Sequence, residues 1–246
     1  MDILLCIDDT DNLESVGTGE LAENMADDIR ARYGGKCSAI TRHQLYVHED
    51  IPYTSHNSSM CFKASIADKA LEPIIRYGIE FLERESASGS DPGLCVAPLH
   101  TIGDIKELIR FGRTAKQEVL TKDAAYNLAR NQGVHLSEHG GTGQGIIGAL
   151  AGIGLRLSGS DGRFKGWFHF EGRDRIMEAR RLYDSPFVDE VRTPEGLRID
   201  PREPIFVGNE VKTVFLNGRA VALVSEQDGE PDARWRTLSK RELKVY

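Results

Sequence analysis

The apolar run at residues 3–7 (ILLCI) constrains the fold most, because it opens directly into Asp8-Asp9-Thr10-Asp11. A short run without polar alternation is typical of a strand that is covered on both faces of a sheet. Such a strand presents the polar residues that follow it in a loop at its carboxyl end. We therefore predict a mixed α/β (α+β) protein in which the first strand delivers an acidic loop.

The rest of the chain alternates between predicted helices and strands, which favours two α/β domains. Apolar residues recur at four-residue spacing from Thr18 until Gly34 and Gly35, and this pattern predicts a helix. Around Asn217-Gly218, two alternating runs predict a hairpin with a type I′ turn. The other predicted strands are 37–47, 58–66 and 165–170, and the other predicted helices are 69–85, two stretches within 103–130, 146–157 and 173–183. We place the domain boundary between residues 125 and 126, with a ferredoxin-like second domain at 126–246.

The acidic residues gather at the start of the chain. The net charge is −7, and residues 1–60 carry 11 acidic and 4 basic side chains, whereas residues 61–246 carry 27 of each. An acidic surface repels phosphate backbones unless a cation intervenes. We therefore expect the acidic part of the chain to bind nucleic acid only weakly.

Neither a membrane span nor a secretory signal is predicted. No apolar run approaches the roughly 20 residues that cross a bilayer, and residues 1–3 lack the positive start of a signal peptide. The four cysteines are far apart, and Cys6, Cys61 and Cys95 lie in apolar runs, which favours buried free thiols. We expect a cytoplasmic protein without membrane association, and the sequence leaves its oligomeric state open, a homo-oligomer included.

Three carboxylates within four residues, Asp8, Asp9 and Asp11, are the first candidate site. Hard oxygen ligands at a strand end suit Mg²⁺, which usually takes one or two carboxylates together with substrate phosphate oxygens. The alternative is turn chemistry, in which the aspartates hydrogen-bond nearby backbone. Thr18 starts the next predicted helix, where it is either a cap or a phosphate contact.

A glycine-rich loop at residues 139–145 is the second candidate site. It contains GxGxxG, but residues 134–139 do not form the strongly apolar strand that a dinucleotide site requires. Backbone amides at the start of the following helix could still hold a mononucleotide phosphate. We predict His139, Gly141, Gly143 and Gly145 as nucleotide-binding residues. The alternative is close helix packing, which fits the later glycines Gly148, Gly152 and Gly154 better.

Several motifs together resemble archaeal isoleucine-tRNA agmatinylcytidine synthetases. The resemblance spans roughly residues 3–225. It is carried by the DDTD loop with Thr18 and by four further patches in the family's order, which are 51–53 with Asn57, 91–93, 143–151 and the hairpin near 211–224. It implies a kinase-like ATP-binding domain at 1–125 followed by a ferredoxin-like domain. It also implies that Asp8, Asp9 and Asp11 handle Mg²⁺ and ATP phosphates and that Thr18 is phosphorylated.

Two departures limit what the resemblance implies. The family has a Cys-Thr-Thr stretch where this chain has Gly17-Thr18-Gly19, so no cysteine role carries over. The family also continues into an OB-fold and a cysteine-rich zinc ribbon that hold tRNA, and residues 1–246 contain neither pattern. We therefore expect tRNA to bind only weakly or through a partner protein.

The resemblance therefore implies an ATP- and Mg²⁺-dependent enzyme that phosphorylates an acceptor and ligates a small, agmatine-like amine to it. The expected partners are a nucleotide and a small amine. Two alternatives stay open: a non-catalytic nucleotide- or polyamine-binding protein, and a catalytic subunit that recruits a separate RNA-binding protein.

Overall fold

The computed structural model describes residues 1–51, 57–170, 175–227 and 232–246, which form two compact units, Met1–Ser158 and Gly159–Tyr246. The boundary expected between residues 125 and 126 falls inside helix α4 (Lys122–Gln132). The first unit extends beyond it because α4 and helix α5 (Gly145–Leu157) bury apolar side chains against the first sheet. The division therefore follows α5.

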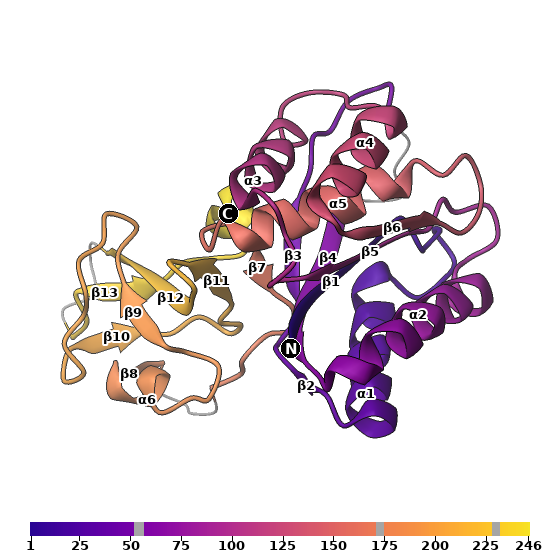
Figure 1. Ribbon diagram of the computed structural model, residues 1–246. Helices are drawn as coiled ribbons and strands as arrows, with labels where there is room; N and C mark the ends of the chain where they lie inside the picture. The colour runs from indigo at the N-terminus through magenta and orange to yellow at the C-terminus, as the bar shows by residue number, and fades with distance from the viewer. Residues whose placement is uncertain (52–56, 171–174, 228–231) are drawn as a thin grey trace. The chain divides into compact units, whose positions relative to one another are not determined.

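The first unit is built on an antiparallel sheet with strand order β6-β5-β1-β4-β3 (Figure 1). A short strand, β2, also pairs with β4. The strands are β1 (Asp2–Asp8), β2 (Lys36–Cys37), β3 (Thr41–Gln44), β4 (Ser58–Ser65), β5 (Gly93–Pro98) and β6 (His135–Glu138). β1 lies between β4 and β5, so both of its edges are hydrogen-bonded.

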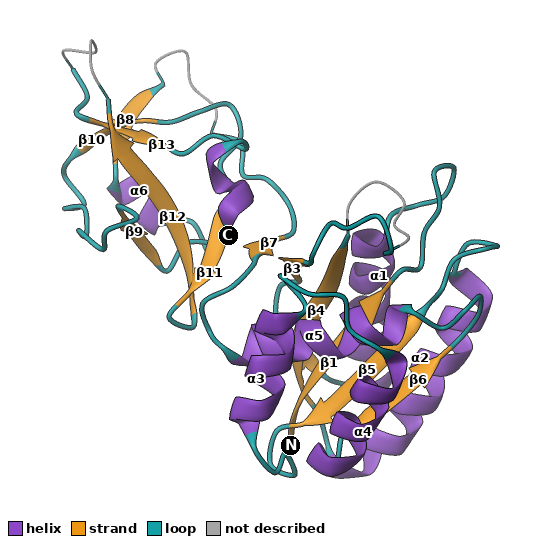
Figure 2. Cartoon of the chain, turned by 90° about the horizontal axis from the view of Figure 1, so that it is seen from above, coloured by secondary structure: helices purple, strands orange, loops and turns teal. Residues whose placement is uncertain are grey.

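Helices cover both faces of this sheet, which confirms the two-sided burial of the first strand (Figure 2). Helices α1 (Thr18–Tyr33) and α2 (Leu71–Glu85), the latter preceded by the 3₁₀ turn η1 (Asp68–Ala70), pack on Ile3, Leu5 and Ile7. Helices α3 (Ile105–Thr114), α4 and α5 build the other core, which includes Leu4 and Cys6. Within the described ranges, no helix is long and apolar enough to cross a membrane.

The elements β1-α1-β3-β4-α2-β5 follow the β-α-β-β-α-β order of ferredoxin-like folds. Their strands are arranged β5-β1-β4-β3, and α1 and α2 share one core on one face. The ferredoxin-like order that the sequence suggested for residues 126–246 thus occurs within residues 2–98. The second unit differs because its described residues form short strands with a single α-helix, the four-residue α6 (Arg180–Tyr183).

Most predicted elements of the first unit are confirmed, and two strands are additional. The helix from Thr18 ends at Gly34, which takes the left-handed conformation at φ 66°. Cys6, Cys61 and Cys95 are buried with free thiols. β5 and β6 were not predicted as strands.

The second unit consists mainly of β-structure. Its strands are β7 (Arg163–Phe164), β8 (Ile176–Glu178), β9 (Glu190–Arg192), β10 (Pro204–Phe206), β11 (Thr213–Leu216), β12 (Arg219–Glu226) and β13 (Trp235–Thr237), followed by the 3₁₀ turn η2 (Glu242–Val245). The predicted hairpin is confirmed, since β11 and β12 pair and Asn217 and Gly218 have φ values of 51° and 74°. One helix was predicted at 173–183, of which residues 173 and 174 lie outside the described residues. The rest of this prediction is wrong except at α6, because β8 is extended and pairs with β10.

Candidate functional site

The site begins at the carboxyl end of β1, where the backbone is tightly constrained. Asp8 ends the strand and is 7% exposed. Asp9 follows with φ 51°, a conformation that few residues other than glycine adopt. On the facing helix α5, a Cβ on Gly148 would lie 1.7 Å from Oδ2 of Asp8, so only glycine lets the helix approach this carboxyl group. An unusual backbone conformation beside a buried acid marks this strand end as a candidate functional site.

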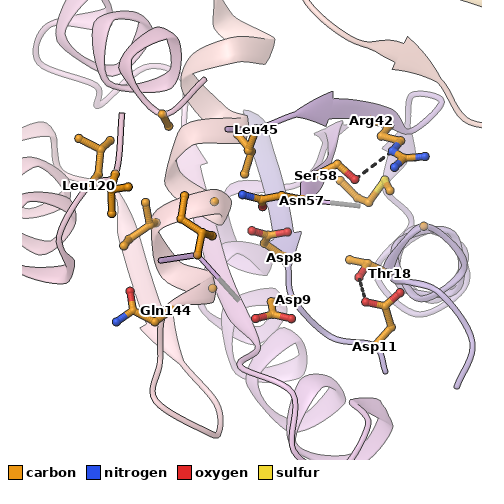
Figure 3. A pocket seen from close by; sticks show the side chains of 18 of the residues that line it. Asp8, Asp9, Asp11, Thr18, Arg42, Leu45, Asn57, Ser58, Leu120 and Gln144 are labelled. Atoms are coloured by element: carbon orange, nitrogen blue, oxygen red, sulfur yellow. Dashed lines mark hydrogen bonds between the residues drawn. The ribbon is translucent and has the colours of Figure 1, made fainter. Parts of the chain in front are cut away.

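A cavity of about 250 Å³ opens at this strand end, within the first unit (Figure 3). Asp8, Asp9 and Asp11 line it together with Thr18. The sequence analysis predicted these four side chains as one site, and the structure brings them together. The remaining lining residues come from β3, β4, α1, α5, the segment after β3 and the α3–α4 connection: Gly17, Gly19, Arg42, Leu45, Asp50, Ile51, Asn57, Ser58, Met60, Ala115, Glu118, Val119, Leu120, Gln144, Gly145, Ile147 and Gly148.

Negative charge dominates the cavity wall. Besides the three aspartates, Asp50 and Glu118 line it, and Arg42 is the single Arg or Lys among its described lining residues. Burial raises the pKa of Asp8 well above its usual range, and the neighbouring Asp9 adds to this shift. Burial also raises the pKa of Asp9 to about 6, with Asp91 and Asp11 contributing. A cation placed among these groups would stabilise their ionised forms.

Thr18 does not act as a helix cap, although capping was one reading of its position. The N-cap residue of α1 is Gly17, and it makes no side-chain capping hydrogen bond. The Thr18 hydroxyl instead donates to Oδ1 of Asp11 at 3.2 Å (Figure 3). It also accepts from the Thr10 hydroxyl at 3.1 Å. Thr18 is 6% exposed. The hydroxyl is therefore positioned by a carboxylate at the cavity wall.

The predicted glycine loop reaches the cavity only at its last two residues, Gln144 and Gly145. Gly145 lines the cavity, and its amide donates to the Asp91 carbonyl at 3.1 Å. Gly141 and Gly143 do not line it and have φ values of 52° and 76°. A Cβ on Gly141 would lie 1.6 Å from Asp91 Oδ1, and one on Gly143 would lie 1.4 Å from Glu138 Oε2. The loop therefore needs these two glycines for its own packing.

Asp91 holds the glycine loop in place. Its carboxylate accepts hydrogen bonds from the amide of Thr142 and, at 2.5 Å, from the Thr142 hydroxyl. Asp91 is 7% exposed and precedes β5, so the acidic side chain connects the start of a central strand to the loop before α5. The resemblance at residues 91–93 thus falls on a position that shapes the cavity wall.

His139 belongs to a hydrogen-bonded row at the sheet edge and does not line the cavity. Its Nε2 lies 2.7 Å from the Ser137 hydroxyl, which lies 2.9 Å from Nε2 of His135. Burial lowers the pKa of both imidazoles. The role of His139 in nucleotide binding remains a prediction.

Close packing explains the later glycines of α5, as one reading of the sequence proposed. A Cβ on Gly152 would lie 2.4 Å from the Cys6 sulfur, and one on Gly154 would lie 1.9 Å from the Leu108 carbonyl oxygen. The helix therefore approaches β1 and α3 more closely than a chain with larger residues would allow.

The fit of the acidic cluster to Mg²⁺ depends on how many protein ligands are needed. Within the described ranges, no three His, Cys, Asp or Glu side chains form a group that could hold a metal ion, so the aspartates are not a three-ligand cage. Mg²⁺ usually binds one or two carboxylates and completes its shell with water and phosphate oxygens. The adjacent, mutually repelling carboxyls of Asp8 and Asp9 fit that donor set.

Residues beyond those predicted complete the site. Arg42 donates to the Ser58 hydroxyl at 2.9 Å (Figure 3). Asn57 donates to the Tyr46 carbonyl at 2.6 Å. Asn57 was part of the resemblance, but no residue pattern singled out Arg42, Asp50 or Glu118. Pro52 and Tyr53, which carried part of the resemblance, lie outside the described residues.

Comparisons with known proteins found similar folds among solved structures. No protein-family model and no curated protein matches the chain. Among solved structures, a tRNA fluorescent labeling enzyme is 21% identical, with a TM-score of 0.54 over 72% of this chain and 40% of its own. TiaS in complex with its tRNA and ATP is 18% identical, with a TM-score of 0.54 over 81% of this chain and 49% of its own. Apo TiaS, a tRNA agmatidine synthetase, matches with the same identity and TM-score over 81% of this chain and 48% of its own. The chain therefore has a TiaS-like mixed α/β fold and spans less than half the length of these proteins.

Proposed function

We propose that this chain binds ATP with Mg²⁺ in the acidic cavity, transfers a phosphoryl group to an acceptor oxygen, and lets a small amine displace the phosphate. The observation that carries the proposal is the convergence of Asp8, Asp9, Asp11 and Thr18 with Arg42 on one cavity. The TiaS-like fold, together with solved TiaS complexes with ATP and with AMPCPP and agmatine, supports it.

The cavity provides two groups suited to a polyphosphate. Asp8 and Asp9 would hold Mg²⁺, which supplies charge neutralisation at the phosphates when bound. Arg42 provides a guanidinium that is oriented by Ser58 and can donate to phosphate oxygens. Phosphoryl transfer depends mainly on such positioning and charge stabilisation.

The remaining carboxylates are suited to a cationic amine. Asp50 and Glu118 line the cavity together with the apolar residues Leu45 and Leu120. An amine with a short aliphatic chain would place its charge on the acids and its methylenes on the apolar wall. An agmatine-like amine has this chemistry.

A binding protein without turnover is the second candidate function, and one observation favours it. Thr18, the residue that the resemblance implies is phosphorylated, is 6% exposed and hydrogen-bonded on both sides. A hydroxyl held in this way also suits a purely structural role. In that case the cavity would bind nucleotide or polyamine without releasing ADP or AMP.

Calorimetric titration with ATP in the presence and absence of Mg²⁺ tests the proposal. We expect Mg²⁺-dependent binding that Asp8→Asn abolishes and that the exposed control Asp184→Asn leaves unchanged. Release of ADP or AMP in the presence of small amines and bulk tRNA distinguishes an enzyme from a binding protein. Wild-type protein that binds no ATP at saturating Mg²⁺ would refute the proposal.

A further inference from the structure

A serine hydroxyl lies between two imidazoles on β6, the strand that ends the strand order of the first unit. The Oγ atom of Ser137 is 2.7 Å from Nε2 of His139 and 2.9 Å from Nε2 of His135. The other ring nitrogen of His139, Nδ1, faces Oε1 of Glu83 in α2 at 3.9 Å. None of these four residues lines the cavity described above. A hydroxyl, an imidazole and a carboxylate in this order form the arrangement in which a base activates a nucleophile.

The alternation of the strand builds this row of side chains. Every second residue from 135 to 139 points to the same face of β6. The β5 residues paired with the row, Leu94 and Val96, belong to the core that α1 and α2 cover. The row therefore faces α2, and α2 supplies Glu83. At the end of the row, the amide of His139 donates to the Pro92 carbonyl at 2.9 Å and fixes the backbone there.

The contacts assign a direction to each hydrogen bond of the row. The carboxylate of Glu83 favours the proton of the neutral His139 ring on Nδ1, which leaves a lone pair on Nε2. That lone pair accepts the hydroxyl proton of Ser137. Because a hydroxyl has only one proton, its oxygen accepts from Nε2–H of His135. The second lone pair of the serine oxygen stays available to attack a carbon atom.

The imidazole next to the hydroxyl is in the form that can take a proton. Burial lowers the pKa of His139 below its ordinary value of 6.5, and the nearby carboxylates of Glu83 and Glu138 oppose this shift. Burial and the neighbouring His139 lower the pKa of His135 as well, against Glu72. Both rings are therefore neutral at pH 7, which suits a general base. The serine between them is half-buried and keeps part of its surface exposed.

Two backbone donors follow the base directly in the chain. Gly140 and Gly141 are exposed, and within the described ranges neither of their amides donates to another protein group. Backbone amides that remain available in this way are the donors that stabilise an oxygen on which negative charge develops.

We propose that Ser137 is the nucleophile of a second site, which hydrolyses short acyl esters with His139 as its base and Glu83 as the residue that positions the base. The serine oxygen forms a bond to the acyl carbon, the bond to the alcohol oxygen breaks, and His139 passes the serine proton to the leaving alcohol. Water then attacks the acyl-serine and gives its proton to His139, which returns it to the serine oxygen as the carboxylic acid leaves. This role is an alternative to the nucleotide contact predicted for His139, and it is independent of the reaction proposed for the cavity.

A fluorophosphonate tests the nucleophile in the full chain, because labelling forms a bond between the serine oxygen and phosphorus and releases fluoride. We expect a single label, which peptide mapping places on Ser137, and hydrolysis of p-nitrophenyl acetate that the label abolishes. His139→Gln should lower the labelling rate at least about 100-fold. Replacement of an exposed serine without a histidine neighbour, Ser88→Ala, should leave the rate unchanged.

The pH dependence of labelling tests the positioning role of the carboxylate. The rate should rise with pH and reach half of its maximum below pH 6.5, because the neutral form of His139 is required. Glu83→Gln removes a group that raises the pKa of His139, so it should move this midpoint to lower pH. Glu80→Gln, an exposed carboxylate on the same helix, should leave the midpoint unchanged.

Three results would overturn the proposal. They are a wild-type protein that the fluorophosphonate does not label, labelling of Ser137→Ala at the wild-type rate, and equal midpoints in Glu83→Gln and Glu80→Gln. The last would show that the row is only structural. The Glu83 side chain is 62% exposed, so its variant tests the arrangement even if His139→Gln unfolds.

Discussion

Replacing Gly148 by alanine is expected to damage the site by direct overlap with a carboxyl group. The new Cβ would lie 1.7 Å from Oδ2 of Asp8 and 2.9 Å from Cδ1 of Leu45. The end of the leucine side chain can move, but Asp8 is 7% exposed and packed against α5. Alanine in a helix gains up to about 1 kcal/mol over glycine, whereas overpacking costs about 1–3 kcal/mol. An overlap this severe with a packed carboxyl group belongs at the upper end of that cost, so we expect a net loss of about 2 kcal/mol in the free energy of unfolding, together with loss of ATP binding.

Urea unfolding and calorimetric titration measure the two effects separately. Gly17→Ala is the control for ATP binding at the same cavity, because its Cβ would lie 3.6 Å from Asp11 Oδ2, an ordinary contact, and its φ is −74°. Because Gly17 is the N-cap of α1, this variant should lose about 1 kcal/mol of stability but keep ATP binding. A second substitution, Asp8→Ala, removes the atoms that overlap, so the double variant should regain stability relative to Gly148→Ala without regaining binding. A Gly148→Ala protein as stable as wild type, or a double variant without recovery, would refute the overlap.

Three further predictions concern a carboxyl group and two glycines. The folded-state pKa of Asp9 is about 6 against its ordinary value of 3.8, so its proton is held more tightly in the folded state. Its contribution therefore lowers the stability of metal-free protein as pH rises from about 4 to about 6, and urea midpoints of wild type and Asp9→Asn should diverge over that window. Gly143→Ala should lower the melting temperature through its φ of 76° and its overlap with Glu138, while any folded fraction binds ATP as wild type does. Gly218→Ala should cost about 1 kcal/mol in chemical unfolding, because the type I′ turn needs φ 74° there, although its Cβ would meet no atom within 4 Å.

The sequence predicted the elements whose signals are local. The first strand was predictable because residues 3–7 are apolar without interruption, and α1 because its spacing and its terminal glycine agree. β6 was missed because it is an edge strand of four residues, His135–Glu138, with half-buried and exposed side chains and no apolar alternation. The helix predicted at 173–183 was wrong because pairing with β10 holds Ile176–Glu178 extended despite helix-favouring residues.

The part of the candidate site that is close in sequence was also predictable, and the part that comes from distant segments was not. Asp8, Asp9, Asp11 and Thr18 are close in sequence, so their meeting at one cavity could be expected from a strand, a loop and a helix. Arg42, Asp50 and Glu118 come from β3 and from two connecting segments. Only the sheet register and the packing of α5 bring them to the same cavity.

The two-sided burial of β1 has a consequence for the order in which the protein folds during synthesis. One face of the strand is covered by α1 and α2, which follow within the first 85 residues, but the face with Leu4 and Cys6 is covered by α5 at Gly145–Leu157. During synthesis β1 therefore keeps an apolar face open until α5, which begins at Gly145, has also been made. Contacts of such long sequence separation form slowly. The nascent first unit would thus depend on chaperone protection until α5 emerges and closes the core.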